Sequence, residues 1–509
     1  MSGGPLGPRA FFLGTALLGA LVAAALYREQ LPLRVGFDLD AFHHMASVRE
    51  LAWGEFPPRH NMVPGYSPQG HYGPYMVLLG LLARVSGVSC LNVLYAAGVL
   101  NLLLYVVTFR WLLVRLVGEG AGRWAAVVPL LLWGPLPIGE MNWASLGWPG
   151  TTCLAEAYNF FYPNQAGLIL VVMILALLAS DKAEAGTNQI DARTGSLAVL
   201  ASALLIATHP LSGILLATAL VALCASRLIT QRLGLRDAAW LMALPPAGLL
   251  LASLWPYYPV LKLLPAFSLP WFRASGVAVS GALARIGNVP PVVVPALSLF
   301  DIFGPASFGF IGLLLLARRR RPFALVWFLA TLAVVMCPYV PLRHRFSLFA
   351  VIPLHVGAAA LFEGGWGRGR AGRAAVVAIL ACGALSVAFR LDWALDREAV
   401  SLDFVTQATP PDAVILANPT LSNGVGGLTG RKVVCPQNPD LFLILAGGAQ
   451  RMSDVGRFLR SRTTPEERAV IVKRWHATHA LIDRIDGGDE ALPYPEVART
   501  DGFILYDLR

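Results

Sequence analysis

Long apolar stretches separated by short polar loops make up most of the first 390 residues of the chain. A helix needs about 20 apolar residues to cross roughly 30 Å of hydrocarbon, and these stretches are that long or nearly so. The pattern predicts eleven membrane-spanning helices. They lie near residues 10–27, 91–109, 124–140, 166–180, 196–208, 211–226, 238–255, 300–317, 323–338, 346–362 and 374–390.

The pattern changes after Phe389, where the chain carries ordinary polar content. The short apolar runs "AVILAN", "KVVC", "HALIDR" and "FILYDL" are typical of strands. A helix should begin at Thr464, with Pro465 at its first position and Glu466 and Glu467 at its positive end. We therefore expect a transmembrane domain over residues 1–390, whose first outer loop is 28–90, and a small α/β domain over 391–509.

Composition agrees with a polytopic membrane protein. The chain is 56% hydrophobic and 14% charged, with a mean hydropathy of +0.61, whereas soluble domains are about 25% charged. A net charge of +10 could indicate nucleic-acid binding, but the arginines lie mainly in short loops between apolar runs, so no nucleic-acid partner is expected. The six cysteines have no paired spacing and predict neither a disulfide framework nor a metal cluster.

The basic residues also predict sidedness. Between the second span and the last, fifteen Lys and Arg residues lie in one set of alternate loops and five in the other, which places the first set in the cytoplasm. To keep the later basic loops on the cytoplasmic side, the chain must form a hairpin at His209 and Pro210 in "ATHPLSG". For the same reason, residues 73–87 should form an amphipathic interfacial helix rather than a span. The N-terminus would then lie inside and the C-terminal domain outside.

The first outer loop begins with a dense group of polar residues, "FDLDAFHHMASVRELAWGEFPPRH" at residues 37–60. If Asp38 caps a helix that stops near Gly54, Asp40 shares a helix face with His43 and His44, three and four residues away. A carboxylate in a partly dehydrated cleft can act as a general base or metal ligand. The alternative is an interfacial helix that Asp38 caps and whose other charges are solvated.

The order of these features resembles a known family. The pair "DLD", His43, "GEFPPR" and "YSPQGHYGPYMVLLGLLARVSG", following a first span, resemble the first outer loop of the GT-C superfamily, integral-membrane glycosyltransferases with lipid-linked sugar donors. The resemblance is motif-like over residues 37–90 and architectural over most of the chain. It implies that Asp40 is the catalytic base, with Asp38 and His43 beside it. No cofactor is certain, and a magnesium or manganese ion bound by Asp38 and Asp40 stays open.

A basic group in "PYVPLRHRFSLF" is a second candidate feature. Arg343, His344 and Arg345 would lie at the outer membrane surface, and with Arg59 they could bind the donor phosphate, because guanidinium forks suit phosphate oxygens. The alternative is an anchor to lipid headgroups.

Further residues could line the substrate cavity. Glu156 and Tyr158 lie in the aromatic outer loop at residues 142–165, which could contact sugar rings or form an ordinary aromatic belt. His44 and Asp301 could line the same cavity, although Asp301 could instead cap a helix. His355 lies within an apolar span, where an ionisable group is either functional or hydrogen-bonded to a neighbouring helix.

Together these features predict an inverting glycosyltransferase of the bacterial cytoplasmic membrane. It would move a sugar from a polyprenyl-phosphate donor to a glycan, lipid or protein acceptor of the cell envelope, on the outer face. The main alternative is a transporter or flippase of a lipid-linked or anionic substrate that uses the basic group and His355. An inactive scaffold that binds glycan or lipid is a third.

Overall fold

The structure is a computed structural model. It describes residues 8–29, 41–65, 71–132, 163–179, 192–230, 234–257, 260–263, 303–336, 346–364, 369–395, 401–436, 447–484 and 492–509. The chain forms two compact units. The helical unit comprises Met1–Ala25, Gly98–Leu254 and Phe267–Ala394, and the mixed unit comprises Leu26–Ala97, Trp255–Ala266 and Leu395–Arg509.

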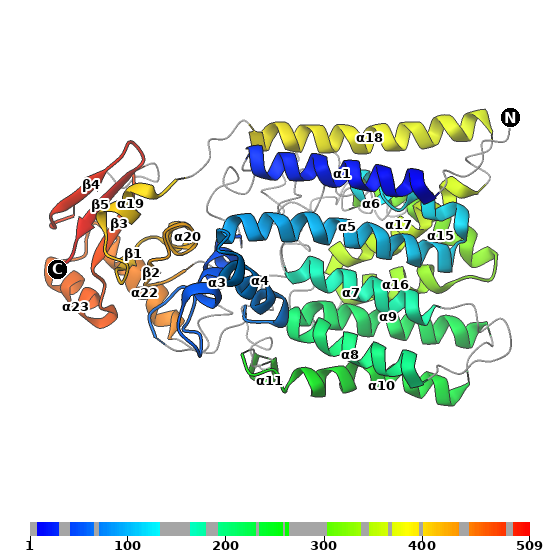
Figure 1. Cartoon of the computed structure of the whole chain (residues 1–509), viewed down its shortest axis with the longest axis horizontal. Helices are drawn as coiled ribbons and strands as arrows, with labels where there is room; N and C mark the ends of the chain where they lie inside the picture. Colours follow the sequence, from blue (N-terminus) through cyan, green and yellow to red (C-terminus); the bar gives the residue numbers. More distant parts are fainter. Residues whose placement is uncertain are drawn as a thin grey trace, which may run out of the picture. The chain divides into compact units, whose positions relative to one another are not determined.

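The helical unit contains helices wholly or in part, and Figure 1 shows them as a bundle. They are α1 (Pro8–Glu29), α5 (Cys90–Leu116), η1 (Glu119–Trp124), α6 (Val127–Leu131), α7 (Pro163–Leu178), α8 (Ala192–Thr208), α9 (Pro210–Ile229), α10 (Leu235–Ala252), η6 (Gly304–Phe308), α15 (Gly309–Arg318), α16 (Phe323–Met336), α17 (Phe346–Glu363) and α18 (Arg370–Leu395).

These helices lie at the predicted apolar stretches. Within the described residues, α5 and α9 are long and apolar enough to cross a bilayer, and several other apolar helices are shorter. The number of helices that cross the membrane therefore stays a prediction.

The sequence "ATHPLSG" forms a hairpin, as predicted. His209 caps α9, since its side chain accepts a hydrogen bond from the Ser212 backbone N–H. Near the start of α8, a Cβ on Gly195 would meet Trp240 of α10; further along, Ser202 of α8 lies where a Cβ on Gly248 of α10 would meet it. The contacts therefore advance along both helices in the same direction. Because α8 and α10 run parallel, the intervening α9 must run antiparallel to them (Figure 1).

Glycines bring α15 and α17 into backbone contact. A Cβ on Gly309 would lie 1.9 Å from the Leu354 carbonyl oxygen, and one on Gly312 would lie 1.8 Å from that of Gly357. No side chain fits at either position. Such close approach of small residues is a common way to pack helices in membranes, where burial of apolar surface provides little driving force.

Arginines hydrogen-bond to the carbonyl ends of helices in this unit. Arg321 donates to the carbonyl oxygens of Leu116 and Val117 at the end of α5, and Arg227 donates to that of Leu178 at the end of α7, at 2.6 Å. A cation at a helix C-terminus is favoured by the helix dipole. Basic loops that the sequence assigns to one membrane side therefore meet one another.

The mixed unit contains helices and one sheet. They are α3 (Ala41–Trp53), α4 (Pro74–Ser86), α11 (Val260–Leu263), α19 (Asp403–Ala408), β1 (Val414–Leu416), α20 (Pro419–Gly424), the π-helical turn η9 (Val425–Thr429), β2 (Lys432–Val433), α22 (Gly448–Phe458), α23 (Pro465–Trp475), β3 (His479–Asp483), β4 (Glu496–Arg499) and β5 (Phe503–Asp507).

The sheet is mixed, with strand order β2-β1-β3-β5-β4. Strand β1 pairs in parallel with β2 and β3, whereas β5 pairs antiparallel with β3 and β4. All four predicted strands are present. The sequence analysis missed β4 because three of its four side chains are exposed, so this edge strand lacks an apolar signal.

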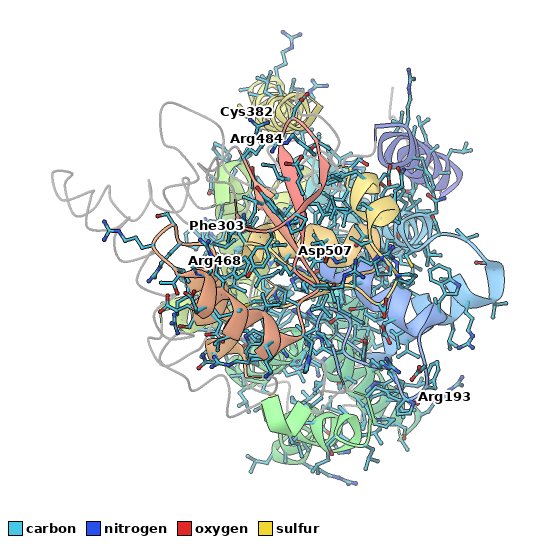
Figure 2. All side chains as sticks on the ribbon, turned by 90° about the vertical axis from the view of Figure 1, so that its left-hand side faces the viewer. Arg193, Phe303, Cys382, Arg468, Arg484 and Asp507 are labelled. Carbon is cyan, nitrogen blue, oxygen red and sulfur yellow. The ribbon has the colours of Figure 1, made fainter. Side chains whose placement is uncertain are left out.

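A buried carboxylate joins α22 to α23 in the mixed unit. Asp454 is fully buried and accepts hydrogen bonds from Arg474 at 2.7 Å and from the Trp475 indole at 2.9 Å. Helix α23 begins with a complete capping box between Thr464 and Glu467, which confirms the predicted start. Arg468, labelled in Figure 2, donates to the Phe458 carbonyl oxygen and ties the two helices together at a second point.

Candidate functional site

Helix α3 carries the described part of the predicted catalytic loop. Ten of its thirteen residues are buried, among them His43 and His44, and it packs against α4, α20 and η9 in the mixed unit. It ends at Trp53, followed by Gly54 as predicted. This burial does not fit the alternative of a helix whose charges are simply solvated.

The first turn of α3 touches the turn η9 backbone to backbone. A Cβ on Gly427 would lie 2.6 Å from the Phe42 Cβ and 2.8 Å from the Phe42 carbonyl oxygen. Only glycine fits there. A π-helical turn is a rare local structure that often marks functional positions, and here it sets the place of the turn that carries His43 and His44.

Arg49 joins the second half of α3 to the same turn. Its guanidinium donates to the carbonyl oxygens of Gly426, Gly427 and Leu428 at 3.1, 2.7 and 3.2 Å. These carbonyls lie in the π-helical turn and need a donor. Arg49 therefore fixes α3 at a second point, one and a half to two turns along the helix from Phe42.

An ion pair with β2 fixes α3 at a third point. Lys432 lies 2.8 Å from a Glu50 carboxylate oxygen, and both side chains are mostly buried. The Lys432 ammonium also donates to the carbonyl oxygens of His60 and Asn61. Next to it, the Val433 backbone N–H donates to the Met62 carbonyl oxygen at 2.8 Å. Burial lowers the pKa of Lys432, and the Glu50 carboxylate opposes that shift.

Three imidazole rings gather at the start of α3. The His71 ring is stacked on that of His43, with ring centroids 5.8 Å apart, and meets the His44 ring edge-on at 5.0 Å. The fourth histidine of this loop, His60, is fully buried. The structure thus brings together two of the predicted site residues and adds His71.

His60 is held in one tautomer. Its Nδ1 accepts hydrogen bonds from the backbone N–H groups of Met62 and Val63, both at 3.1 Å, so in the neutral ring the proton resides on Nε2. Burial lowers its pKa well below the usual value, and the positive charge of Lys432 lowers it further. His60 therefore acts as a neutral capping group for the turn after α3.

Arg59 forms an ion pair at the surface of this loop. Its guanidinium lies 2.7 Å from the Glu55 carboxylate, and both side chains are substantially exposed. Its backbone carbonyl accepts a 2.6 Å hydrogen bond from the Tyr72 hydroxyl, whose pKa is raised by burial and by the carboxylate of Glu50. A donor phosphate at Arg59 would compete with Glu55.

The remaining predicted site residues lie outside the described residues. The expected metal site rests on two of them, and within the described part of the chain no group of three His, Cys, Asp or Glu side chains is arranged to hold a metal ion. A metal site at Asp38 and Asp40 stays a prediction. The site residues outside the described ranges are Asp38, Asp40, Glu156, Tyr158, Asp301, Arg343, His344 and Arg345.

The sequence analysis missed the residues that hold α3. Arg49 and Glu50 were visible as charges in the predicted helix, but nothing local indicated that their partners lie near residues 426–432. The glycine-rich segment "GVGGLTG" at residues 424–430 was the available signal, because closely spaced glycines permit backbone contact.

His355 in the helical unit has a structural role. Its Nε2 lies 3.2 Å from the Leu132 carbonyl oxygen, to which it must donate, and its ring meets Phe109 edge-on. This arrangement matches a histidine hydrogen-bonded to a neighbouring helix.

No protein-family model matches the sequence, and neither does any curated protein. Solved structures do match. ArnT from Cupriavidus metallidurans bound to undecaprenyl phosphate is 16% identical with a TM-score of 0.58, and the match covers 97% of this chain and 98% of that one. The apo form of ArnT gives 15% and 0.55 with the same coverage.

A second protein, the oligosaccharyltransferase AglB from Archaeoglobus fulgidus, matches in complex with an inhibitory peptide and a dolichol-phosphate. It is 12% identical with a TM-score of 0.55, and the match covers 93% of this chain and 69% of AglB. At such identities the similarity establishes the fold. The chain shares the fold of ArnT and AglB, both bound to a lipid phosphate in these structures, in agreement with the fold that the resemblance implied. It follows ArnT over almost the full length of both chains.

Proposed function

We propose that this protein is an integral-membrane glycosyltransferase that moves a sugar from a polyprenyl-phosphate donor to an extracytoplasmic glycan, lipid or protein acceptor. One observation carries the proposal: contacts of Gly427, Arg49 and Lys432 hold α3 in place. This helix directly follows Asp38 and Asp40 in the sequence. Its fold agrees, since the ArnT structure that it follows over nearly its whole length holds undecaprenyl phosphate.

The chemistry needs a base and a cation group. Asp40 would take the proton of the acceptor hydroxyl as that oxygen attacks the anomeric carbon. The bond between the anomeric carbon and the phosphate oxygen breaks, the configuration inverts, and the lipid phosphate leaves with the bonding electrons. Arg343, His344, Arg345 and Arg59 would stabilise the phosphate charge. Asp38 would orient Asp40, and no step through a metal ion is included.

The described residues supply preorganisation. His43 and His44 lie on the first turn of a buried helix that is fixed at three points, so the helix would hold both residues in place for catalysis. The His43 carbonyl oxygen accepts hydrogen bonds from the Ser47 hydroxyl at 2.8 Å and the Asn61 amide at 3.2 Å. We propose that His43 positions Asp40 and that His44 contacts the substrate, together with Glu156, Tyr158 and Asp301.

Sidedness is part of the proposal. The contact of Arg321 with the end of α5 and the ion pair of Arg123 with Glu363 at 2.7 Å join loops that carry the excess of positive charge. A common cytoplasmic face is consistent with both contacts. The N-terminus would lie inside the bacterial cytoplasmic membrane, and the first outer loop and the C-terminal domain would lie outside.

The alternative is a transporter or flippase that uses the basic group and His355. The His355 imidazole donates to the Leu132 carbonyl oxygen, which supports a structural role for that side chain. Arg343 and Arg345 serve the transferase equally well.

The test is a transfer assay in proteoliposomes that contain a lipid extract with radiolabelled polyprenyl-phosphate sugars. Asp40→Asn should abolish release of polyprenyl phosphate while native mass spectrometry still detects the bound donor, because the base is lost and the lipid site is kept. Glu363→Gln, a change at the far ion pair, is the matched control and should retain transfer. Full turnover by Asp40→Asn would refute its role as base, and lipid movement across the bilayer without sugar transfer would favour the transporter.

A further inference from the structure

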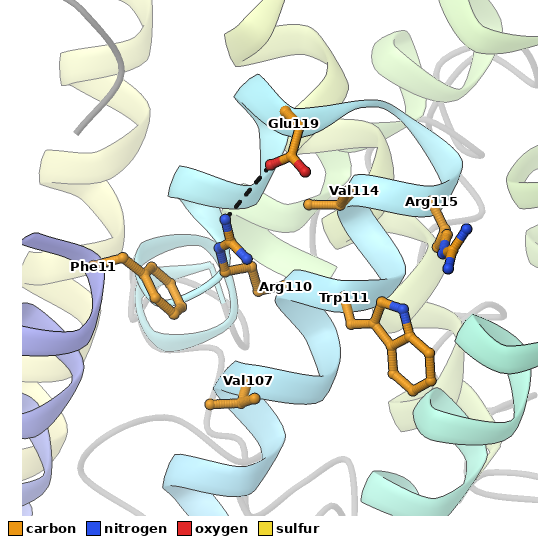
Figure 3. A pocket seen from close by; sticks show the side chains of 7 residues that line it. All are labelled: Phe11, Val107, Arg110, Trp111, Val114, Arg115 and Glu119. Atoms are coloured by element: carbon orange, nitrogen blue, oxygen red, sulfur yellow. Dashed lines mark ion pairs between the residues drawn. The ribbon is translucent and has the colours of Figure 1, made fainter. Parts of the chain in front are cut away.

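A cavity of about 460 Å³ lies at the C-terminal end of α5, within the helical unit (Figure 3). Five of its lining residues recur every three or four positions and so share one face of α5. Helix α1 and the turn after α5 provide the other walls. The lining residues are Phe11, Val107, Arg110, Trp111, Val114, Arg115 and Glu119.

The backbone after α5 fixes the most central of these side chains. The chain turns at Gly118, whose φ of +133° is accessible to glycine, and η1 then folds back onto α5. A Cβ on Gly122 would lie 3.3 Å from the Arg110 Cγ, so the stem of Arg110 is confined. Figure 3 shows the Arg110 side chain directed toward Glu119, and its guanidinium also lies 5.2 Å from the Phe11 ring centroid.

The cavity carries a net positive charge. Arg110 lies 3.5 Å from the Glu119 carboxylate, which is 80% exposed, and such a long, solvated pair is weak. Within the described part of the chain, Arg115 has no ion-pair or hydrogen-bond partner. The lining residues therefore carry two guanidinium groups and one carboxylate, and the Arg115 guanidinium is available to an anion in the cavity.

The length of α5 would place the cavity at the edge of a hydrocarbon layer that begins at Cys90. Arg110 follows Cys90, the first residue of α5, by twenty residues, which is about 30 Å of helix and equals the thickness of the hydrocarbon core. Arg115 lies about 7 Å further along, at headgroup depth. Trp111 lies between the two arginines, and tryptophan is enriched at this interface.

We infer that this cavity binds the phosphate headgroup of an anionic glycerophospholipid from the surrounding bilayer. The Arg115 guanidinium would receive the phosphodiester, the positive charge of Arg110 would add to the attraction, and an acyl chain would follow Val107 along the exposed face of α5. Basic cavities between membrane helices suit anionic headgroups, and the apolar wall favours a lipid over free phosphate. This inference does not depend on the proposed transferase activity.

Native mass spectrometry of the detergent-solubilised protein tests the inference, with phosphatidylglycerol or phosphatidylcholine added at equal concentrations. Wild-type protein should retain phosphatidylglycerol preferentially. Arg115→Gln should weaken that retention about fivefold, the effect expected for one arginine near a headgroup. Arg319→Gln is the matched control, because Arg319 is an exposed arginine in a neighbouring loop that does not line the cavity.

Two variants and one competitor decide the outcome. Glu119→Gln should increase retention of phosphatidylglycerol, since it removes the only carboxylate among the lining residues. Equal effects of Arg115→Gln and Arg319→Gln, or no preference between the two lipids, would overturn the inference. Displacement of the lipid by millimolar inorganic phosphate would also overturn it, because the site would then take phosphate from solution rather than a lipid.

Discussion

At the residue scale, the candidate loop depends on side chains that are charged but buried. The Lys432 ammonium donates hydrogen bonds to the Glu50 carboxylate and to two backbone carbonyl oxygens. The Arg49 guanidinium donates to three backbone carbonyl oxygens. Backbone carbonyls supply most of the partners, so the arginine and lysine act as cross-links between segments far apart in sequence. Removing either cation leaves buried acceptors without a donor, which is costly.

The pair of Lys432 and Glu50 is suited to a double-mutant cycle. Lys432→Met should lower the free energy of unfolding by about 2–4 kcal/mol, because it leaves the Glu50 carboxylate buried and unpaired. Adding Glu50→Gln should recover part of that loss. Denaturation in detergent measures both values. Strictly additive single changes would show that the two groups do not interact.

His60 makes stability depend on pH. Its pKa is lowered by burial in the folded protein, so below about pH 6.5 the unfolded chain takes up a proton that the folded chain does not. The free energy of unfolding should therefore fall by up to about 1.4 kcal/mol per pH unit as pH drops from 6.5 toward the lowered folded-state pKa.

The variant His60→Asn tests whether His60 causes this pH dependence of the free energy of unfolding. An Asn side-chain oxygen can accept from backbone N–H groups two and three residues on, as His60 Nδ1 does, but it does not titrate. The variant should show a pH slope smaller by about one proton between pH 6.5 and 5. An unchanged slope in chemical denaturation would assign the effect to other groups.

At the element scale, small residues decide which helices approach closely. Helices α15 and α17 meet at Gly309, Gly312 and Gly357 with no room for a side chain. In the mixed unit, Gly427 has the same role between α3 and η9. Periodicity predicted these helices, yet it carries no information on which neighbour each one meets.

Gly312→Ala should destabilise the helical unit strongly. Its Cβ would overlap a backbone carbonyl, which cannot rotate away, so we expect a loss of about 3 kcal/mol or more. Gly14→Ala on α1 is the control, since nothing lies within 4 Å of a Cβ there, and it should leave the melting temperature in detergent unchanged or slightly raised. Similar melting of the two variants would contradict the observed packing.

At the scale of the whole molecule, sequence patterns predicted the helical stretches, four strands and the start of α23, because each depends on local periodicity or capping. They also predicted a helix that stops near Gly54, and α3 ends at Trp53. They could not show that Arg49 bonds to residues 426–428 or that His71 meets His43, since such contacts join distant segments. The roles of Asp40, Arg343 and Arg345 stay predictions.

The mixed unit should respond as one body to a change at η9. Gly427→Ala should push the first turn of α3 away and raise hydrogen exchange across residues 41–65, with a loss of about 1–3 kcal/mol in stability. Gly456→Ala on the exposed face of α22 is the control and should leave exchange in that loop unchanged. Faster exchange confined to residues 425–429 would show that α3 is held by other contacts.

The three points that hold α3 also impose an order on biosynthesis. Arg49 and its carbonyl partners are separated by about 380 residues, so the loop that carries Asp38 and Asp40 leaves the ribosome long before residues 426–433 are made. A nascent chain would already be threaded into the bilayer while its candidate catalytic loop was still unformed. Helix α3 would be held at all three points only after residues 426–433 had been made and had met the first loop, which makes their synthesis a late step of maturation.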